Sequence, residues 1–233
     1  MREIVLDTET TGLEPSQGHR IIEIGCLELR NRTPTGAKYH AYINPERDVP
    51  EESQRITNLS TEFLRDKPVF ADVVDGFLAF VGDSGLVIHN AEFDLKFLNA
   101  ELSKLKKGPI APSRAVDTML IARRRFPGAS ASLDALCRRF DISLDDRKAK
   151  GHGALLDAAL LAEVYLELSG GRQPGLELVA TSGSSENRVV TFKPVVPRPS
   201  PLPPRLSAED IERHDAAIAT LGQSAIWRLQ AEA

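Results

Sequence analysis

The 233-residue chain has few of the features that mark exported or membrane proteins. Its two cysteines, Cys26 and Cys137, lie far apart inside apolar stretches, so we expect buried free thiols in a reducing compartment. No charged segment followed by an apolar run opens the chain, and no apolar run reaches the ~18 residues of a membrane span. We therefore expect a cytoplasmic protein that makes no contact with membranes.

An excess of positive charge is also absent. The formal net charge of −4 argues against a protein that holds duplex DNA by bulk electrostatics. A short piece of nucleic acid can still be held through metal ions and a local basic patch. Hydrophobic content of 42% and charged content of 27% are typical of a soluble globular protein. The length allows one sizeable core and a smaller appendage.

The spacing of apolar residues predicts an α/β domain over residues 1–171. Strands are expected at residues 4–6, 21–29, 39–43, 86–89 and 115–117. Helices are expected at 61–65, 70–80, 93–105 and 155–168, directly after residue 117, and after Ser132 as N-cap. Strands that alternate with helices after an initial strand meander indicate a mixed sheet with helices packed on it.

The composition changes after Gly171. Seven of the fifteen prolines lie between Arg172 and Arg205, together with clusters of glycine and serine. Such a segment is extended and does not pack, so residues 172–206 are predicted to form a linker.

The last segment, residues 207–233, has the pattern of a short helical tail. Ser207 and Asp210 resemble a helix-capping box, and apolar residues follow at roughly helical spacing, namely Ile211, Ile218 and Leu221. Ile226 and Trp227, the only tryptophan, come after them. One short helix cannot form a core alone, so we expect a docking peptide; the alternative is a tail that folds back on its own domain.

Four acidic residues and one histidine carry the chemistry predicted for the domain: Asp7, Glu9, Asp94, Asp157 and His152. Each carboxylate lies among apolar residues, where a charge is costly unless it is paired. No basic residue is placed locally to pair with them, whereas a divalent cation such as Mg²⁺ prefers carboxylate and phosphate oxygens. This set therefore predicts metal-assisted cleavage of a phosphodiester.

The spacing of these residues supports a shared site. Asp7 and Glu9 are two apart on a strand and leave the same face. Asp94 falls in the first turn of a helix that follows a buried strand, and Asp157 lies on the helix after residue 154. His152 lies between two glycines in the loop before that helix, which suits a mobile general base.

A two-metal mechanism follows from this arrangement. Asp7 and Asp157 would hold one ion, and Asp7, Glu9 and Asp94 the other, with His152 accepting the proton of the attacking water. Arg147, Lys148 and Lys150 precede the histidine. They could guide the phosphate backbone, and the alternative is an ordinary solvated loop.

The acid set resembles the DEDDh branch of the DnaQ-like 3′–5′ exonucleases, and within it the proofreading subunits of bacterial replicative DNA polymerases. The likeness extends over essentially the whole chain and includes several further segments, namely residues 18–25, 66–70, 87–94, 126–128, 132–137 and 152–159. It implies an RNase H-like fold, dependence on two Mg²⁺ or Mn²⁺ ions, and removal of mispaired nucleotides from the single-stranded 3′ end of DNA.

The resemblance also implies roles for individual residues. Asp7, Glu9 and Asp157 would be direct metal ligands, Asp94 the fourth acid and His152 the base. The terminal nucleotide would be contacted by Leu13 as an apolar wedge, together with Thr10, Glu52, Asn90 and Phe93. Thr57 and Asn58 replace a His-Gly pair common in this family, which places substrate affinity in doubt but not the reaction class.

Two segments beyond the domain fit the same family. Gln173, Leu176 and Leu178 resemble the weak sliding-clamp-binding peptide of this family. The tail resembles the segment that binds the catalytic alpha subunit of the polymerase, with Ile211, Ile218, Leu221, Ile226 and Trp227 as its apolar contacts. A tether of this kind raises effective concentration without tight binding, and it implies a cytoplasmic, nucleoid-associated replisome.

Two other functions stay open at this stage. A stand-alone relative that trims RNA or short oligonucleotides would use the same catalytic set, because DNA and RNA differ at contacts to the 2′-OH. An adaptor with an inactive nuclease domain is a third possibility, which the intact acid set disfavours.

Overall fold

The computed structural model describes residues 1–145, 147, 151–171 and 207–221. The chain divides into two units, Met1–Ala180 and Thr181–Ala233, and each is considered by itself. The predicted linker at 172–206 lies outside the described residues, so the domain borders stay predictions.

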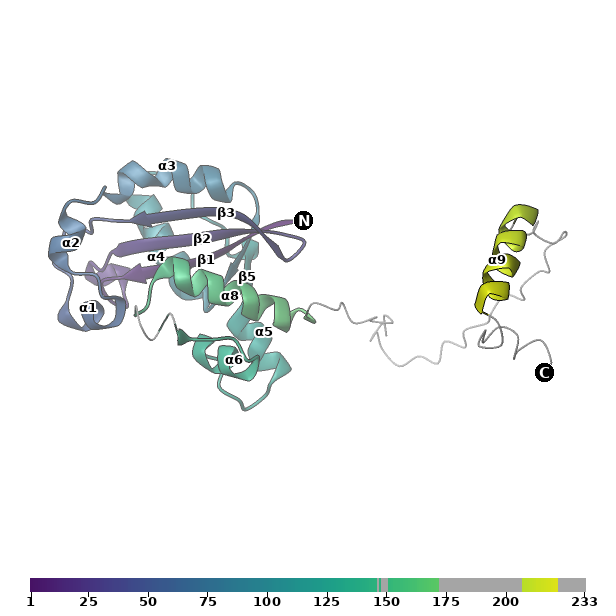
Figure 1. Cartoon of the computed structure of the whole chain (residues 1–233). Helices are drawn as coiled ribbons and strands as arrows, with labels where there is room; N and C mark the ends of the chain where they lie inside the picture. The colour runs from purple at the N-terminus through teal and green to yellow at the C-terminus, as the bar shows by residue number, and fades with distance from the viewer. Residues whose placement is uncertain (146, 148–150, 172–206, 222–233) are drawn as a thin grey trace, which may run out of the picture. The chain divides into compact units, whose positions relative to one another are not determined.

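A five-stranded mixed sheet forms the centre of the first unit (Figure 1). Its strands are β1 (Arg2–Thr10), β2 (Ile21–Arg30), β3 (Thr33–Tyr42), β4 (Gly85–Ile88) and β5 (Ala115–Asp117). The order is β3-β2-β1-β4-β5, with β1–β2 and β2–β3 antiparallel and β1–β4 and β4–β5 parallel. The predicted mixed sheet is confirmed, and the first strand of the chain lies at its centre.

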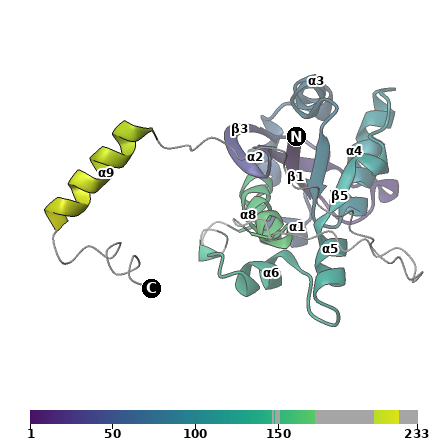
Figure 2. The same cartoon turned by 90° about the vertical axis from the view of Figure 1, so that its right-hand side faces the viewer.

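Helices cover both faces of this sheet (Figure 2). Helices α3 (Phe70–Val81) and α4 (Ala91–Lys104) pack on one face, and α5 (Thr118–Arg125), α6 (Leu133–Arg139) and α8 (Ala154–Leu168) on the other. Side chains of a strand alternate between faces, so Ile4 and Leu6 join the first core whereas Val5 joins the second. Each such buried aliphatic side chain stabilises the fold by roughly 1.5–3 kcal/mol.

Two elements differ from the prediction. Helix α1 (Glu51–Thr57) was not expected, and β3 begins at Thr33 rather than at Tyr39. Helix α1 has only seven residues, too few for a helical period to stand out, although acidic residues in its first turn suit the helix dipole. The early part of β3 contains Pro34, which an edge strand tolerates, and it forms because β2 pairs with it.

Helix α2 (Thr61–Arg65) matches the predicted range and follows α1. Together these helices cover a third apolar cluster of buried side chains, namely Ile22, Val49, Leu59 and Leu64. Both cysteines are buried free thiols, as predicted. Among the described residues, no helix is both long and apolar enough to cross a bilayer.

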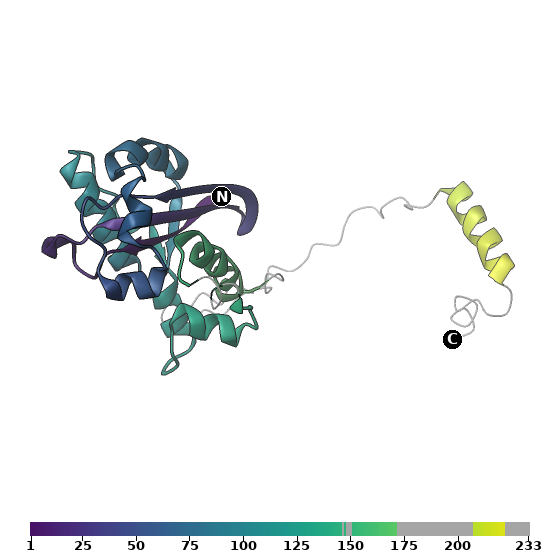
Figure 3. The ribbon, with the colours of Figure 1, turned by 60° about the vertical axis from the view of Figure 1, so that its left-hand side comes forward.

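Gly25 lets the last helix of the domain approach the sheet closely. On β2 it pairs with Asp7 of β1. A Cβ atom at Gly25 would lie 2.3 Å from the backbone of Ala154 and Leu155, the start of α8. Figure 3 shows α8, in green, against the strands. The absent side chain thus brings the start of α8 next to the strand end that carries the first two acids.

The second unit contains helix α9 (Ala208–Leu221), as predicted. Its start is capped by Ser207: the Asp210 N–H donates to the serine hydroxyl at 3.1 Å, and the hydroxyl donates to the Asp210 carboxylate at 2.6 Å. No residue of α9 is buried, and Ile211 and Leu221 are 49% and 54% exposed. An apolar stripe on a helix with no buried residue is typical of a docking segment. Ile226 and Trp227 lie outside the described residues.

Candidate active site

Three elements bring the predicted acids together at one end of the sheet. Asp7 and Glu9 lie at the end of β1, Asp94 is in the first turn of α4, and Asp157 is in the first turn of α8. His152 precedes α8 in the loop, and its side chain is 44% exposed. These placements match the sequence prediction.

Asp94 is held by the residue between the two acids of β1. The backbone N–H and the hydroxyl of Thr8 both donate to Asp94 Oδ1, at 3.1 and 2.7 Å. Both residues are buried. Two hydrogen bonds to one oxygen fix the orientation of the carboxylate.

The helix that carries Asp94 is positioned by Asp117. Its carboxylate accepts from the N–H of Ala91, at the start of α4, and from the N–H of Met119 in α5. One acid therefore sets the starts of two helices, although it is not part of the catalytic set. The sequence pattern identified its strand but not this role.

The acids strongly perturb one another. Burial, together with repulsion from Asp94, Glu9 and Asp157, holds the pKa of Asp7 well above its usual range. Burial, followed by repulsion from Asp157 and Glu23, raises the pKa of Glu9 to about 8. Burial also raises the pKa of Asp94 to about 7, against the lowering effect of the Thr8 hydrogen bonds. The charges of such a cluster are neutralised either by protonation or by a bound cation.

A divalent cation fits the residues present. Ligand atoms of Glu9, His152 and Asp157 all lie within 4.8 Å of one another. Asp157 is 4% exposed, and its Oδ1 has no hydrogen-bond partner. An unpaired buried carboxylate oxygen is costly unless something binds it, and hard cations prefer such oxygens. Asp7 and Asp94 fall outside this tight group but interact with it electrostatically.

One cation of the chain already enters this cluster, which corrects the expectation that no local basic residue pairs with the acids. Arg147 Nη2 donates to Asp157 Oδ2 at 2.7 Å and to His152 Nδ1 at 2.8 Å. Its Nη1 donates to Asp134 at the start of α6. The Arg147 side chain is 11% exposed, so it does not form the solvated loop considered above. Lys148 and Lys150 lie outside the described residues.

A cavity of about 420 Å³ lies beside the acids. Five of the residues predicted to contact the nucleotide line it together with Glu9, namely Thr10, Leu13, Glu52, Thr57 and Phe93. Its volume lies in the ~300–1,000 Å³ range of small-ligand sites. Leu13 and Ile56 line this cavity and are 79% and 48% exposed. Their apolar side chains are therefore accessible for contact with a nucleotide base.

Asn90 does not share this cavity. It lines a separate one, of about 520 Å³, with Asp117 and residues of α4 and α5. Its backbone adopts a left-handed conformation, with φ of 66°, at the cap of α4. In this structure Asn90 therefore shapes the start of the helix that carries Asp94.

Thr57 and Asn58, which stand where the family often has a His-Gly pair, lie next to the loop that carries His152. The Thr57 hydroxyl donates to Ser53 O at 2.9 Å and accepts from Leu59 N–H. Both of these hydrogen bonds stabilise the end of α1. Asn58 Nδ2 lies 2.3 Å from where a Cβ on Gly151 would be. The His152 N–H donates to Ile56 O at 3.1 Å. The end of α1 therefore positions the backbone of the candidate base.

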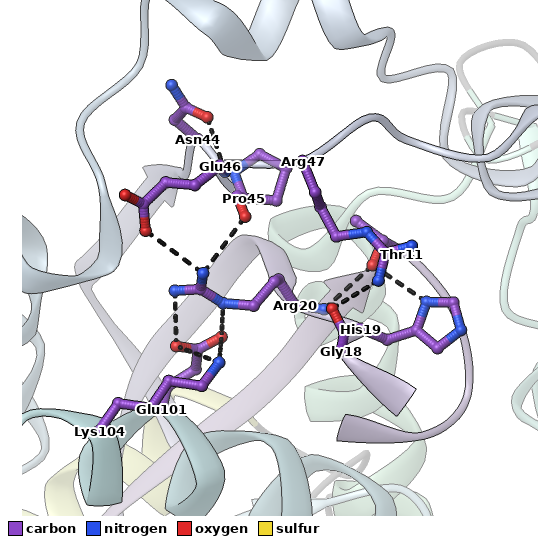
Figure 4. Close-up of polar contacts among 10 residues, drawn as sticks. All are labelled: Thr11, Gly18, His19, Arg20, Asn44, Pro45, Glu46, Arg47, Glu101 and Lys104. Carbon is purple, nitrogen blue, oxygen red and sulfur yellow. Dashed lines mark hydrogen bonds and ion pairs between the residues drawn. The ribbon is translucent and has the colours of Figure 1, made fainter. Parts of the chain in front are cut away.

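The loop that carries Leu13 is braced by a polar network around Arg20 (Figure 4). The Arg20 guanidinium binds the buried carboxylate of Glu101 on α4 through two nitrogens, at 2.5 and 2.9 Å. Its backbone N–H donates to the Thr11 hydroxyl, which contacts the His19 ring at 3.2 Å. A Cβ at Gly12 would lie 2.3 Å from that ring.

Several residues of the site were not found from the sequence. Thr8 donates to Asp94. The nucleotide cavity is lined by Ile56 and His19. Arg147 contacts Asp157. Of these, only Thr8 had a signal, because a polar residue between two strand-end acids is buried on the opposite face. Gln173, Leu176 and Leu178 lie outside the described residues.

Comparison with known proteins gives a consistent result. Residues 4–165 match the family model described as Exonuclease. A curated relative from Rickettsia felis, named DNA polymerase III subunit epsilon, is 47% identical over 97% of this chain and 99% of its own length. Proteins of the same name from Salmonella typhimurium and Escherichia coli K12 are 41% and 40% identical, over 97% of both chains in each pair.

Solved structures support the fold. Exonuclease X in complex with 5′ overhanging duplex DNA aligns with a TM-score of 0.57 at 24% identity, over 72% of this chain and 90% of that chain. The nuclease domain of 3′hExo, a DEDDh family member bound to rAMP, aligns with a TM-score of 0.62 at 17% identity, with the same coverage. At these identities the likeness concerns the fold alone.

Proposed function

Because the chain belongs to the Exonuclease family, among relatives that are epsilon subunits of DNA polymerase III, we propose how its own residues perform the reaction of that family. It is a 3′–5′ exonuclease that proofreads DNA synthesis as part of the replicative polymerase. The observation that supports the site assignment is the meeting of Asp7, Glu9, Asp94, Asp157 and His152 at the joint end of β1, α4 and α8.

Asp7, Glu9, Asp94 and Asp157 hold two divalent metal ions in this proposal, either Mg²⁺ or Mn²⁺. When bound, such ions lower the pKa of a bound water and stabilise charge on the leaving 3′ oxygen. The chain supplies the buried carboxylates, whose mutual repulsion favours cation binding. The unpaired Oδ1 of Asp157 and the ligand atoms within 4.8 Å support this assignment.

His152 accepts the proton of the attacking water. Its side chain is 44% exposed, so water can reach the ring, and its backbone N–H donates to Ile56 O. Histidine side chains commonly transfer protons in enzymes, which suits this role.

The cavity beside Glu9 receives the terminal nucleotide. Leu13 and Ile56 contact the base, Phe93 packs against it, and Thr10, Glu52 and Thr57 form the polar wall. A mispaired 3′ end frays into single strand more readily than a paired end. A cavity that accepts one unstacked nucleotide therefore selects for mispairs.

The second unit docks the enzyme on its polymerase. We assign contact with the alpha subunit to the apolar stripe of α9, together with Ile226 and Trp227, and a weak contact with the sliding clamp to Gln173, Leu176 and Leu178. The exposed stripe supports the first assignment. A subunit of the replicative polymerase would work in the cytoplasm, at the nucleoid.

The test is a gel assay on matched DNA and RNA primers with 3′ mismatches, in Mg²⁺, in Mn²⁺ and in EDTA. We expect metal-dependent, stepwise loss of 5′-monophosphates from the DNA 3′ end, faster at a mismatch and much slower on RNA. Faster cleavage of RNA would instead identify a stand-alone trimming enzyme. If the folded protein cleaves neither primer, the result would support the third hypothesis, an adaptor with an inactive nuclease domain.

A further inference from the structure

Arg147 is the cation of the described residues that contacts both a proposed metal ligand and the proposed base. A single nitrogen, Nη2, donates to Asp157 Oδ2 and to His152 Nδ1. The side chain is 11% exposed and Asp157 is 4% exposed, so water screens this ion pair little.

These contacts are incompatible with the working site. A guanidinium only donates hydrogen bonds, so Nδ1 of His152 accepts from it and the proton of the neutral ring lies on Nε2. Neither ring nitrogen then has a free lone pair to accept a proton from water. The same guanidinium occupies the Oδ2 of Asp157, so only Oδ1 is open to a divalent cation, and the positive charge of the arginine repels that cation.

Asp134 keeps the guanidinium in place from the outer side. It accepts from Arg147 Nη1, is 42% exposed and lies at the start of α6. Arg147 Nε is buried without a hydrogen-bond partner. The arginine is therefore held by its two charged partners and not by a fully satisfied hydrogen-bond network.

We propose that Arg147 is an internal counter-ion of the metal-free site, which competes with the divalent cation for Asp157 and leaves both Asp157 and His152 before hydrolysis. This inference rests on the proposed function, because it takes Asp157 as a ligand and His152 as the base. It assigns Arg147 a positioning role: in the metal-free state the arginine keeps the acids together and the base engaged, and metal entry releases both.

The consequence is a trade between metal affinity and stability. A positive charge beside Asp157 opposes an incoming divalent cation, and the ion pair at Oδ2 draws negative charge away from the carboxylate that the cation needs. Removal of Arg147 should therefore strengthen metal binding. It should also destabilise the metal-free fold, because it leaves the buried acids uncompensated.

The experiment measures Mn²⁺ affinity of the full chain by isothermal titration calorimetry. Arg147→Met keeps an apolar stem of similar length and should lower the Kd for Mn²⁺ by about tenfold. Arg147→Lys, which keeps the charge but not the fork, and Asp134→Asn, which loosens the anchor, should each lower it by a smaller factor. The matched control is Arg124→Gln, an exposed arginine on α5, which should change the Kd by less than about twofold.

Thermal unfolding in EDTA gives an independent readout. Arg147→Met should unfold at a lower temperature than Arg124→Gln, and saturating Mn²⁺ should close the gap. An Mn²⁺ Kd in Arg147→Met that equals or exceeds that of the control would overturn the proposal. If that variant does not fold, Arg147→Lys and Asp134→Asn decide in the same way.

Hydrolysis by the wild-type chain, measured in parallel, separates the two hypotheses. Cleavage of DNA with an unchanged Kd in the arginine variants would remove this inference and leave the proposed function. A lower Kd for Mn²⁺ in the arginine variants, without any cleavage of DNA by the wild type, would remove the proposed function and leave the competition between Arg147 and the metal.

Discussion

Thr8 and Asp94 lie 86 residues apart in sequence and are joined by two hydrogen bonds to a single carboxylate oxygen. The contact connects the strand that carries Asp7 and Glu9 to the helix that carries Asp94. It also opposes the burial that raises the pKa of Asp94 to about 7. Asp94 is thus positioned by a residue that is not itself a proposed metal ligand.

Replacement of this threonine tests that relationship. Thr8→Val removes the hydroxyl donor and keeps the shape, so Asp94 loses one of its two hydrogen bonds. We expect a 10–100-fold lower rate of DNA hydrolysis, roughly the effect of removing a group that orients a metal ligand. Thr8→Ser retains the hydroxyl and should stay within about threefold of wild type in the same single-turnover assay. Equal rates for valine and serine would show that the backbone N–H alone suffices.

Asp7 should be essential for hydrolysis and dispensable for folding. Asp7→Asn keeps the size but removes a buried charge that repels Asp94, Glu9 and Asp157. We expect at least about 1,000-fold slower hydrolysis, since metal-stabilised charge contributes several kcal/mol. In EDTA the variant should unfold at a higher temperature than wild type. A lower unfolding temperature would contradict the assigned repulsion.

Metal-free stability should fall as the pH rises. The pKa values of Glu9 and Asp94, about 8 and about 7, exceed the ordinary values of 4.5 and 3.8. Between about pH 4.5 and 8 the folded state therefore binds more protons than the unfolded state, so raising the pH lowers the free energy of unfolding.

We expect a loss of more than about 2 kcal/mol across this window in EDTA. Urea unfolding at several pH values measures it, and saturating Mg²⁺ should remove most of the slope. A free energy of unfolding that rises with pH in EDTA would show that the acids are not buried together.

Gly25 should tolerate no side chain. Alanine there would place a Cβ 2.3 Å from the backbone of α8, and backbone atoms cannot yield as a flexible side chain does. We expect Gly25→Ala to lower the free energy of unfolding by about 2 kcal/mol or more, and to lower activity because α8 carries Asp157. Gly108→Ala, where nothing lies within 4 Å, is the matched control and should be nearly neutral in both assays.

Loss of the tail should separate catalysis from association. Deletion from Ser207 onward should leave hydrolysis of free single strands intact and abolish binding to the polymerase in gel filtration. Ile218→Asp should weaken the same association, because it places a charge on the apolar stripe of α9. Ala216→Asp lies on the opposite side of the helix and is the control. Retained association after the deletion would refute the docking role.

Much of the site could be predicted because its residues carry local signals. Asp7 and Glu9 follow an apolar run at strand spacing, and Asp157 lies at the start of an apolar helix. The neighbouring residues of each acid therefore indicate both its secondary structure and its buried surroundings. The same logic identified Ser132 as an N-cap, which accepts a hydrogen bond from Ala135 N–H.

What could not be predicted depends on contacts between distant segments. Arg147 stands in a charged stretch that is typical of a solvated loop, and only its ion pairs with Asp134 and Asp157 turn it inward. Helix α1 is too short to show a period, and the first half of β3 forms because β2 offers it a pairing edge. In each case tertiary structure overrides a weak local preference.

The order of the elements along the chain has a consequence for synthesis on the ribosome. The central strand β1 is the first element of the nuclease domain to emerge and α8 is the last described one, at rates of roughly 5–20 residues per second. A nascent chain that stops before α8 lacks Asp157 and leaves part of one face of its sheet uncovered. An interrupted product is therefore both inactive and unstable, and nuclease activity arises only when the domain is complete.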